Sequence, residues 1–347
     1  MSDLVNVSST ALYAAFIIYL VATLFFGATI RDKKSRGKKG YAETIAITMT
    51  IIGFLAQLVY FVTRWIASGH APVSNMFEFV TFLGMSLVLA FIIIYFIYRV
   101  SVLGLFALPI AMLIIAYASM FPSEIAPLVP SLQSHWLYIH VITVSLSQGV
   151  LAVSFVAGLI YLVKAVNQNG WNKKNIWLEI IIFFLFVALG FIISTTTFNV
   201  MDYEASFEIE QDGRIVQMDY ALPPIAGPEG GTLITPDKMS PMIDTPNWMQ
   251  GKDAPKKFNT LIWSILVGGA LYLLIVLIFR KRIGALVQPL TKNVNNNLVD
   301  EITYRSVAIG FPLFTLGGLI FASIWAQIAW DRFWGWDPKE VWALITW

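Results

Sequence analysis

Residues 77–98 read FEFVTFLGMSLVLAFIIIYFIY, and this run decides the fold class. It carries a single charged side chain, Glu78, and it is long enough for a helix to cross a hydrocarbon layer, which takes about 20 apolar residues. Similar runs cover residues 10–30, 42–66, 102–121, 136–164, 176–197, 259–279 and 306–328. The sequence therefore predicts an all-α, polytopic transmembrane helical bundle with eight full spans. A further apolar stretch runs from Val341 to Trp347, and we expect it to be a truncated ninth span.

The composition indicates that lipid is the solvent. Charged residues make up 13% of the 347 residues, whereas an ordinary soluble domain carries about 25%. The mean hydropathy of +0.71 agrees with this interpretation. The absence of cysteine excludes disulfides, zinc–thiolate sites, iron–sulfur clusters and thiol chemistry. The N-terminus has no basic segment and no cleavage site of a signal peptide, so we expect the first run to remain as a helix.

Basic residues gather in alternate loops. The first loop, at 31–39, reads RDKKSRGKK, and further basic residues lie at 164–174 and 280–282, whereas 67–75 and 122–134 contain no Lys or Arg. Because Lys and Arg favour the cytoplasmic side, this alternation predicts an extracytoplasmic N-terminus. We expect a multi-pass protein of a bacterial cell membrane.

The long loop at 198–258 is predicted to be extracytoplasmic and is rich in acidic residues, Pro and Gly. Residues 207–216 alternate between apolar and polar side chains around Asp212-Gly213, which is a hairpin turn signal. We therefore expect a small β-hairpin there. The predicted organisation has three parts: six helices in 1–197, this loop, and the helices of 259–347 that flank a tryptophan-rich segment at 325–342.

The tryptophan-rich segment reads WAQIAWDRFWGWDPKEVW. A position at the membrane interface explains one or two tryptophans in a span, but residues 325–347 contain six, interleaved with charged residues. Pro338 prevents a continuous helix and suits the first turn of a new one. The segment is therefore predicted to form a bent aromatic platform. Haem fits such a surface, because it is planar and apolar with an ionic edge; a quinone headgroup or a lipid fits less specifically.

This pattern resembles the WWD domain of haem-handling proteins in cytochrome c biogenesis, and WDPKE at 336–340 resembles the CcsA/ResC type of the system II pathway in particular. GHAPVSNMFE at 69–78 resembles the family's first outer loop, and LQSHWLYIHV at 132–141 its outer histidine segment. The chain departs from the family at Asp331, where glycine is usual. An acidic residue there either weakens the attraction for propionates or caps a turn.

The resemblance implies that pairs of histidines ligate haem iron. His140 matches the first histidine of the outer pair; its alternative is a hydrogen bond between helices. His135 is expected to be a solvated loop histidine or a propionate contact, and His70 a pocket lining. Glu78 is expected to pair with Arg64 or to cap a helix. The family's second outer histidine and its transmembrane histidine come after the WWD segment, beyond Trp347.

The resemblance further implies a membrane subunit of a cytochrome c synthase complex. Such a subunit exports or holds haem b at the outer membrane face and presents it to apocytochrome c, together with a ResB/CcsB-type membrane partner. No catalytic residue and no nucleic-acid contact are expected, and whether the chain counts as an enzyme stays open. Two alternatives remain: a haem exporter or sensor without ligation activity, and a non-haem transporter or lipid-handling protein. The expected iron ligand is His140, and the expected haem-binding residues are His140, Trp325, Trp330, Trp334, Trp336, Asp337, Arg332, Lys339 and His70.

Overall fold

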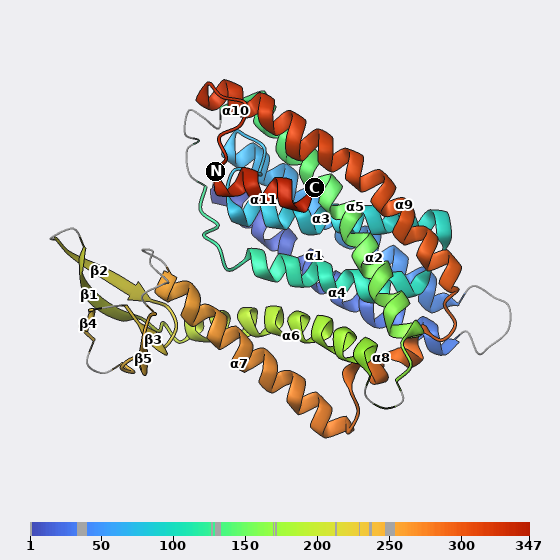
Figure 1. Cartoon of the computed structure of the whole chain (residues 1–347). Helices are drawn as coiled ribbons and strands as arrows, with labels where there is room; N and C mark the ends of the chain where they lie inside the picture. The colour runs from blue at the N-terminus through green and yellow to red at the C-terminus, as the bar shows by residue number, and fades with distance from the viewer. Residues whose placement is uncertain are drawn as a thin grey trace. The chain divides into compact units, whose positions relative to one another are not determined.

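The computed structural model describes residues 2–32, 40–125, 128, 133–168, 170, 172–211, 214–228, 230–235, 238–246 and 254–347. In these residues, eight helical stretches are long and apolar enough to cross a membrane, so the predicted all-α polytopic fold is confirmed (Figure 1). They are α1 (Ser2–Asp32), α2 (Tyr41–Ser68), α3 (Met76–Tyr98), α4 (Ser101–Ala118), α5 (His135–Ala165), α6 (Lys173–Val200), α7 (Ala254–Phe279) and the continuous run of α9 (Asn296–Phe314), η2 (Thr315–Phe321) and α10 (Ala322–Trp330).

The chain divides into two compact units, 1–167 with 287–347, and 168–286. In the first unit, α1 packs on α2 and α4, α3 packs on α4 and α5, and α5 runs beside α9 along most of its length (Figure 1). The core of this bundle contains fully buried residues such as Phe26, Phe91 and Ile160. These helices carry apolar residues on every side, because lipid takes the place of water around the bundle.

The helix boundaries depart from the predicted spans near the C-terminus. A short helix that the sequence did not predict, α8 (Ile283–Thr291), precedes α9. Helix α9 begins at Asn296, ten residues before the predicted start at 306, and the Asn295 side chain caps it by accepting a hydrogen bond from the Asn297 N–H. Hydropathy located only the apolar part of this helix. Pro338 is the first residue of α11 (Pro338–Thr346), as predicted.

Between α9 and α10 the helix widens into the π-helical segment η2. The N–H of Ala322 donates to the carbonyl oxygen of Gly317, five residues earlier, whereas an α-helix uses the carbonyl four residues earlier. A π-helix leaves the apolar composition of a span unchanged, so the hydropathy pattern contained no sign of it.

In the second unit, α6 packs against α7 where a Cβ on Gly268 would lie 2.3 Å from the carbonyl oxygen of Phe186. Strand β1 (Ala205–Gln211) pairs antiparallel with β2 (Arg214–Tyr220), in the manner that the alternating residues predict; the turn residues 212–213 lie outside the described residues. Strand β4 (Thr232–Leu233) extends this sheet, and β3 (Ala226–Gly227) pairs with β5 (Ile243–Asp244). The structure groups this loop with α6 and α7 in one compact unit.

Candidate functional site

A cavity of about 620 Å³ lies in the first unit, between α5, η2, α10 and α11. Its volume falls within the range of about 300–1,000 Å³ that small-molecule and cofactor sites occupy. Most of its wall is apolar or aromatic. The lining residues are Ser74, Leu137, His140, Val141, Gly318, Ala322, Trp325, Ala326, Trp330, Phe333, Trp334, Asp337, Pro338, Lys339, Glu340 and Ala343.

His140 forms one side of this cavity. It lies on α5, less than two turns after the Ser134 cap, and its ring stacks on Trp325 with centroids 5.8 Å apart and planes at 8°. Its Nδ1 lies 2.8 Å from the carbonyl oxygen of Gly317. Trp330 meets Trp325 edge-on, with ring centroids 4.7 Å apart. Three rings from α5 and α10 therefore form a continuous aromatic wall.

The segment after α10 turns sharply at Asp331. This residue is the C-cap of α10 in the left-handed conformation, with φ of +55°, and its N–H donates to the Gln327 carbonyl. Glycine adopts this conformation most readily and asparagine or aspartate less so. Of the two roles expected for Asp331, the structure thus shows the turn cap.

The motif Asp337-Pro338-Lys339-Glu340 is a capping box at the start of α11. The Asp337 carboxylate accepts hydrogen bonds from the backbone N–H groups of Lys339 and Glu340, at 2.8 and 2.9 Å. The Glu340 carboxylate accepts from the N–H groups of Gly335 and Asp337, at 2.6 and 3.2 Å. Both acidic side chains are therefore engaged with backbone donors, and Lys339 contributes a cation to the lining.

The structure brings six of the nine expected haem-binding residues to this cavity: His140, Trp325, Trp330, Trp334, Asp337 and Lys339. Trp336 does not line it: this side chain is 68% exposed and its backbone has φ of +57°. Arg332 does not line it either, because its guanidinium lies over the backbone of Gly335, where a Cβ would be 2.2 Å from Arg332 Cζ. The turn geometry, which the sequence did not show, directs these two side chains elsewhere.

His70 lies in a different pocket, of about 340 Å³, together with His135 and Tyr138. Its Nδ1 is 3.1 Å from the Ala71 carbonyl oxygen, so Nδ1 is the protonated nitrogen. His135 is the first residue of α5 and is exposed. His70 therefore lines a different pocket from the platform tryptophans, and its expected role in binding haem stays a prediction.

Sequence reasoning missed Ser74, which forms part of the cavity wall. Its hydroxyl and its N–H both donate to one Glu78 oxygen, at 2.8 and 3.0 Å, and Arg64 Nε donates to the other oxygen at 2.7 Å. Arg64 also donates to the Ser123 carbonyl. The predicted Arg64–Glu78 pair is confirmed, while Asn75 caps α3. The buried ion pair thus holds the turn that carries Ser74.

Gly317 and Gly318 are also missed residues. A Cβ on Gly317 would lie 2.7 Å from the backbone nitrogen of Val144, and Gly318 lines the cavity. Adjacent glycines within an apolar span are a sign of close backbone approach, and this signal was available in the sequence.

The cavity suits a planar aromatic ligand with an anionic edge. Trp325 and Trp330 line it with aromatic surface, while Leu137 and Ala322 provide aliphatic surface. In the part of the chain that the structure describes, His140 Nε2 has no hydrogen-bond partner, so it is available as an acceptor or as a metal ligand. These features fit haem.

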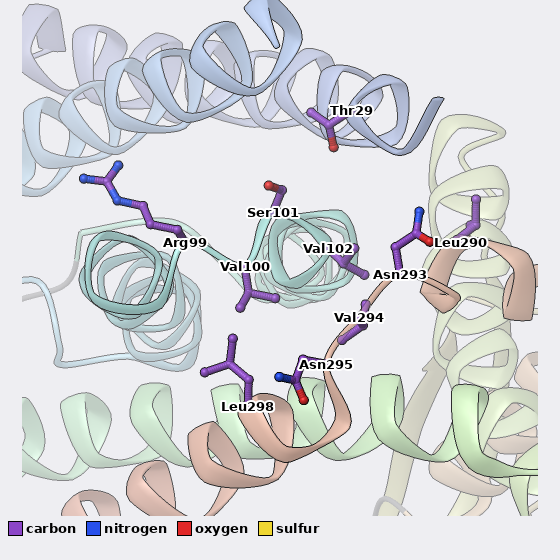
Figure 2. Close-up of a pocket in the computed structure, with 10 residues that line it drawn as sticks. All are labelled: Thr29, Arg99, Val100, Ser101, Val102, Leu290, Asn293, Val294, Asn295 and Leu298. Carbon is purple, nitrogen blue, oxygen red and sulfur yellow. The ribbon is translucent and has the colours of Figure 1, made fainter. Parts of the chain in front are cut away.

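A third cavity in the first unit is much smaller, at about 170 Å³ (Figure 2). It lies where the end of α1, at Thr29, meets the α3–α4 turn at 99–102 and the segment that leads into α9, at 293–298. This volume lies below the range of about 300–1,000 Å³ that small-molecule and cofactor sites occupy. It is too small for a macrocycle, so the haem-sized cavity beside His140 is the stronger candidate.

Comparisons with known proteins show which family the chain is similar to. The model of the family described as "Cytochrome C assembly protein" matches residues 73–199 and 260–347. The cytochrome c biogenesis protein CcsA of Pyropia yezoensis is 26% identical over 350 residues, which cover 100% of this chain and 82% of the relative. CcsA of Nostoc sp. strain PCC 7120 is 27% identical over 346 residues, covering 99% and 82%. CcsA of Gloeobacter violaceus is 26% identical over 352 residues, covering 100% and 83%.

Proposed function

Because the chain belongs to the cytochrome c assembly family, we propose that it holds haem in the cavity beside His140 and presents it for attachment to apocytochrome c. The chain is a multi-pass membrane protein with a role in cytochrome c biogenesis. One observation carries the finer proposal. A cavity of about 620 Å³ is lined both by an imidazole and by three of the tryptophans of the WWD-like segment.

Each lining residue has a role that follows from its chemistry. His140 Nε2 ligates the haem iron, since neutral imidazole is a common iron ligand. Trp325, Trp330 and Trp334 contact the faces and edges of the macrocycle. The Lys339 ammonium pairs with a propionate. The substrate haem b is thereby held by one axial ligand, an aromatic wall and one ionic contact.

The chain contains no cysteine, so it supplies no thiol. In the attachment reaction, each apocytochrome thiol adds across a haem vinyl group, with sulfur bonding to one carbon and the proton going to the other. The chain's own contribution is to orient haem and to protect its iron by axial ligation. We propose that it does so at the outer face of the membrane, with a ResB/CcsB-type membrane subunit as partner.

Purification of the full-length protein, co-expressed with its partner subunit, tests the proposal. We expect a Soret band in the wild type, loss of most of it in His140→Ala, and a weaker band in Trp325→Ala. His135→Ala is the matched control, because this histidine lies in another pocket. A wild-type protein that never carries haem would contradict the proposal and favour a lipid-handling or transport role.

A second measurement separates presentation from export or sensing. The haem-loaded complex is mixed with a reduced apocytochrome c, and thioether formation is followed by haem staining after denaturing electrophoresis. Attachment that depends on His140 supports presentation. Bound haem without attachment supports the exporter or sensor alternative.

Orientation is tested by cysteine labelling, for which the cysteine-free chain provides a clean background. Ser240→Cys lies in the loop between α6 and α7, and Lys292→Cys lies between α8 and α9; both residues are exposed. We expect a membrane-impermeant maleimide to label only the first in intact cells. The reverse pattern would contradict the proposed outer location.

A further inference from the structure

The hydrogen bond of His140 determines which ring nitrogen is free. Nδ1 lies 2.8 Å from the Gly317 carbonyl oxygen. A carbonyl only accepts hydrogen bonds, so Nδ1 carries a proton and the neutral ring keeps its lone pair on Nε2. The ring lines the cavity, while its Nδ1 edge is engaged with the helix backbone. The nitrogen available to a ligand in the cavity is therefore Nε2.

The acceptor belongs to the π-helical segment η2. The Gly317 carbonyl already accepts from the Ala322 N–H in the i+5 register of a π-helix, and it uses its second lone pair for His140. In the α register its partner would be residue 321. A π-helical turn widens the helix and changes the direction of its carbonyl groups, and such turns are frequent at functional sites.

Glycine at position 317 allows the two helices to approach. A Cβ there would lie 2.7 Å from the Val144 nitrogen and 3.0 Å from the Thr143 carbonyl carbon. Both are backbone atoms of α5, so a change of side-chain rotamer cannot relieve the clash. Position 317, which supplies the acceptor carbonyl for His140, therefore tolerates no side chain at this spacing of η2 and α5.

The same helix pair makes a second contact of this kind two turns away. The Ser147 hydroxyl donates to the Gly310 carbonyl at 2.7 Å. Ser147 lies seven residues after His140, and Gly310 lies seven residues before Gly317. The Ser147–Gly310 contact fixes the antiparallel register of α5 and α9 within regular α-helix. The segment η2 then sets the direction of the Gly317 carbonyl that His140 uses.

We propose that the π-helical segment Thr315–Phe321 is a positioning element that fixes the tautomer and orientation of His140, with Gly317 as the positioning residue. The identity of the metal that Nε2 meets rests on the proposed function. The hydrogen bond also raises the basicity of the ligating imidazole, which stabilises ferric over ferrous iron and lowers the haem midpoint potential.

The tautomer is measured without haem. The chain has three histidines, so ¹⁵N spectra of histidine-labelled wild-type protein in lipid are assigned with His70→Gln and His135→Gln. We expect His140 with Nδ1 protonated and Nε2 bare. An Nδ1-bare tautomer, or an even mixture, would overturn the inference. This result stands whether or not haem binds, so it is separable from failure of the proposed function.

Gly317→Ala tests the positioning role. Its Cβ separates η2 from α5, so we expect a mixture of His140 tautomers, haem binding weaker by about 10- to 100-fold, and a higher midpoint potential for the haem that remains. The matched control is Gly310→Ala, whose Cβ would lie 2.7 Å from the Leu151 side chain. It disturbs the same helix pair but leaves His140 unchanged.

The two variants distinguish positioning of His140 from helix packing. A changed tautomer and potential in Gly317→Ala, with neither changed in Gly310→Ala, supports the proposal. Equal effects of both variants indicate helix packing alone and overturn it, as does a Gly317→Ala protein with wild-type spectra. If Gly317→Ala does not fold, two other measurements decide whether the proposal holds. They are the His140 tautomer in the wild type and the haem midpoint potential of protein that carries Nδ1-methylhistidine at position 140. That residue cannot donate to Gly317, so an unchanged potential overturns the proposal.

Discussion

Glu78→Gln should destabilise the protein far more than a change of one formal charge suggests. The Glu78 carboxylate lies 2.7 Å from Arg64 Nε, and the two side chains are 1% and 2% exposed. The second oxygen of Glu78 accepts the hydroxyl and the N–H of Ser74, which lines the candidate haem cavity. The substitution keeps the shape of the side chain but leaves the Arg64 guanidinium buried without a counter-charge.

The magnitude follows from this burial. Removing one partner of a buried ion pair costs about 3–5 kcal/mol, because the remaining charge stays desolvated. Salt and solvent do not screen this pair, since neither side chain reaches the surface. The exposed pair Arg305–Glu301 provides the contrast, with side chains 59% and 43% exposed. Exposed pairs four residues apart on a helix contribute about 0.3–0.5 kcal/mol, so Glu301→Gln should be nearly neutral.

The free energy of unfolding is measured by titrating detergent-solubilised protein with a denaturing detergent and following tryptophan fluorescence. Glu78→Gln should lower it by several kcal/mol and reduce haem occupancy, because the amide keeps only one acceptor oxygen in place of the two that serve Arg64 and the Ser74 turn. The double variant Arg64→Met/Glu78→Leu should recover part of the loss, since it removes both charges. Equal effects of Glu78→Gln and Glu301→Gln would refute the reasoning. So would a double variant whose loss equals the sum of the losses in Arg64→Met alone and Glu78→Leu alone.

Three further predictions concern other parts of the chain. Gly268→Ala should destabilise the α6–α7 pair by about 1–3 kcal/mol, because its Cβ would lie 2.3 Å from a backbone oxygen of α6. Gly269→Ala is the control in the same unfolding assay. It should be neutral, because its Cβ would meet the Phe183 ring at 3.7 Å. Asp337→Ala should cost about 1 kcal/mol through loss of the α11 cap, which limited proteolysis near α11 would detect; unchanged cleavage would contradict it. Trp336→Ala should retain nearly all haem while Trp325→Ala gives a weaker Soret band, because Trp325 lines the cavity and Trp336 does not; equal losses would contradict this.

The spans could be predicted from sequence because insertion in lipid depends on the composition of a run of about 20 residues. All eight runs became helices that are long and apolar enough to span. The polar start of α9 and the short helix α8 were missed, since hydropathy does not register helix in polar residues. The π-helical segment was missed because it depends on a hydrogen-bond register and leaves apolar composition unchanged.

The candidate site was predicted in its composition but not in its geometry. His140 and the tryptophan segment were linked across nearly two hundred residues by resemblance to a family, and the structure places them around one cavity. Trp336 was expected at the site as part of the WWD-like segment and Arg332 as a propionate partner, yet neither residue lines the cavity. Ser74 was not included, because its place depends on the buried pair of Arg64 and Glu78.

The sequence by itself determined that this protein crosses a membrane repeatedly and carries an aromatic segment suited to haem. Both properties follow from the local concentration of residue types, which a single segment possesses on its own. Only the tertiary structure decided which tryptophans face His140 and which nitrogen of His140 is free. Those properties depend on the direction of side chains and carbonyl groups across packed helices, and they arise when α5 and η2 come into contact.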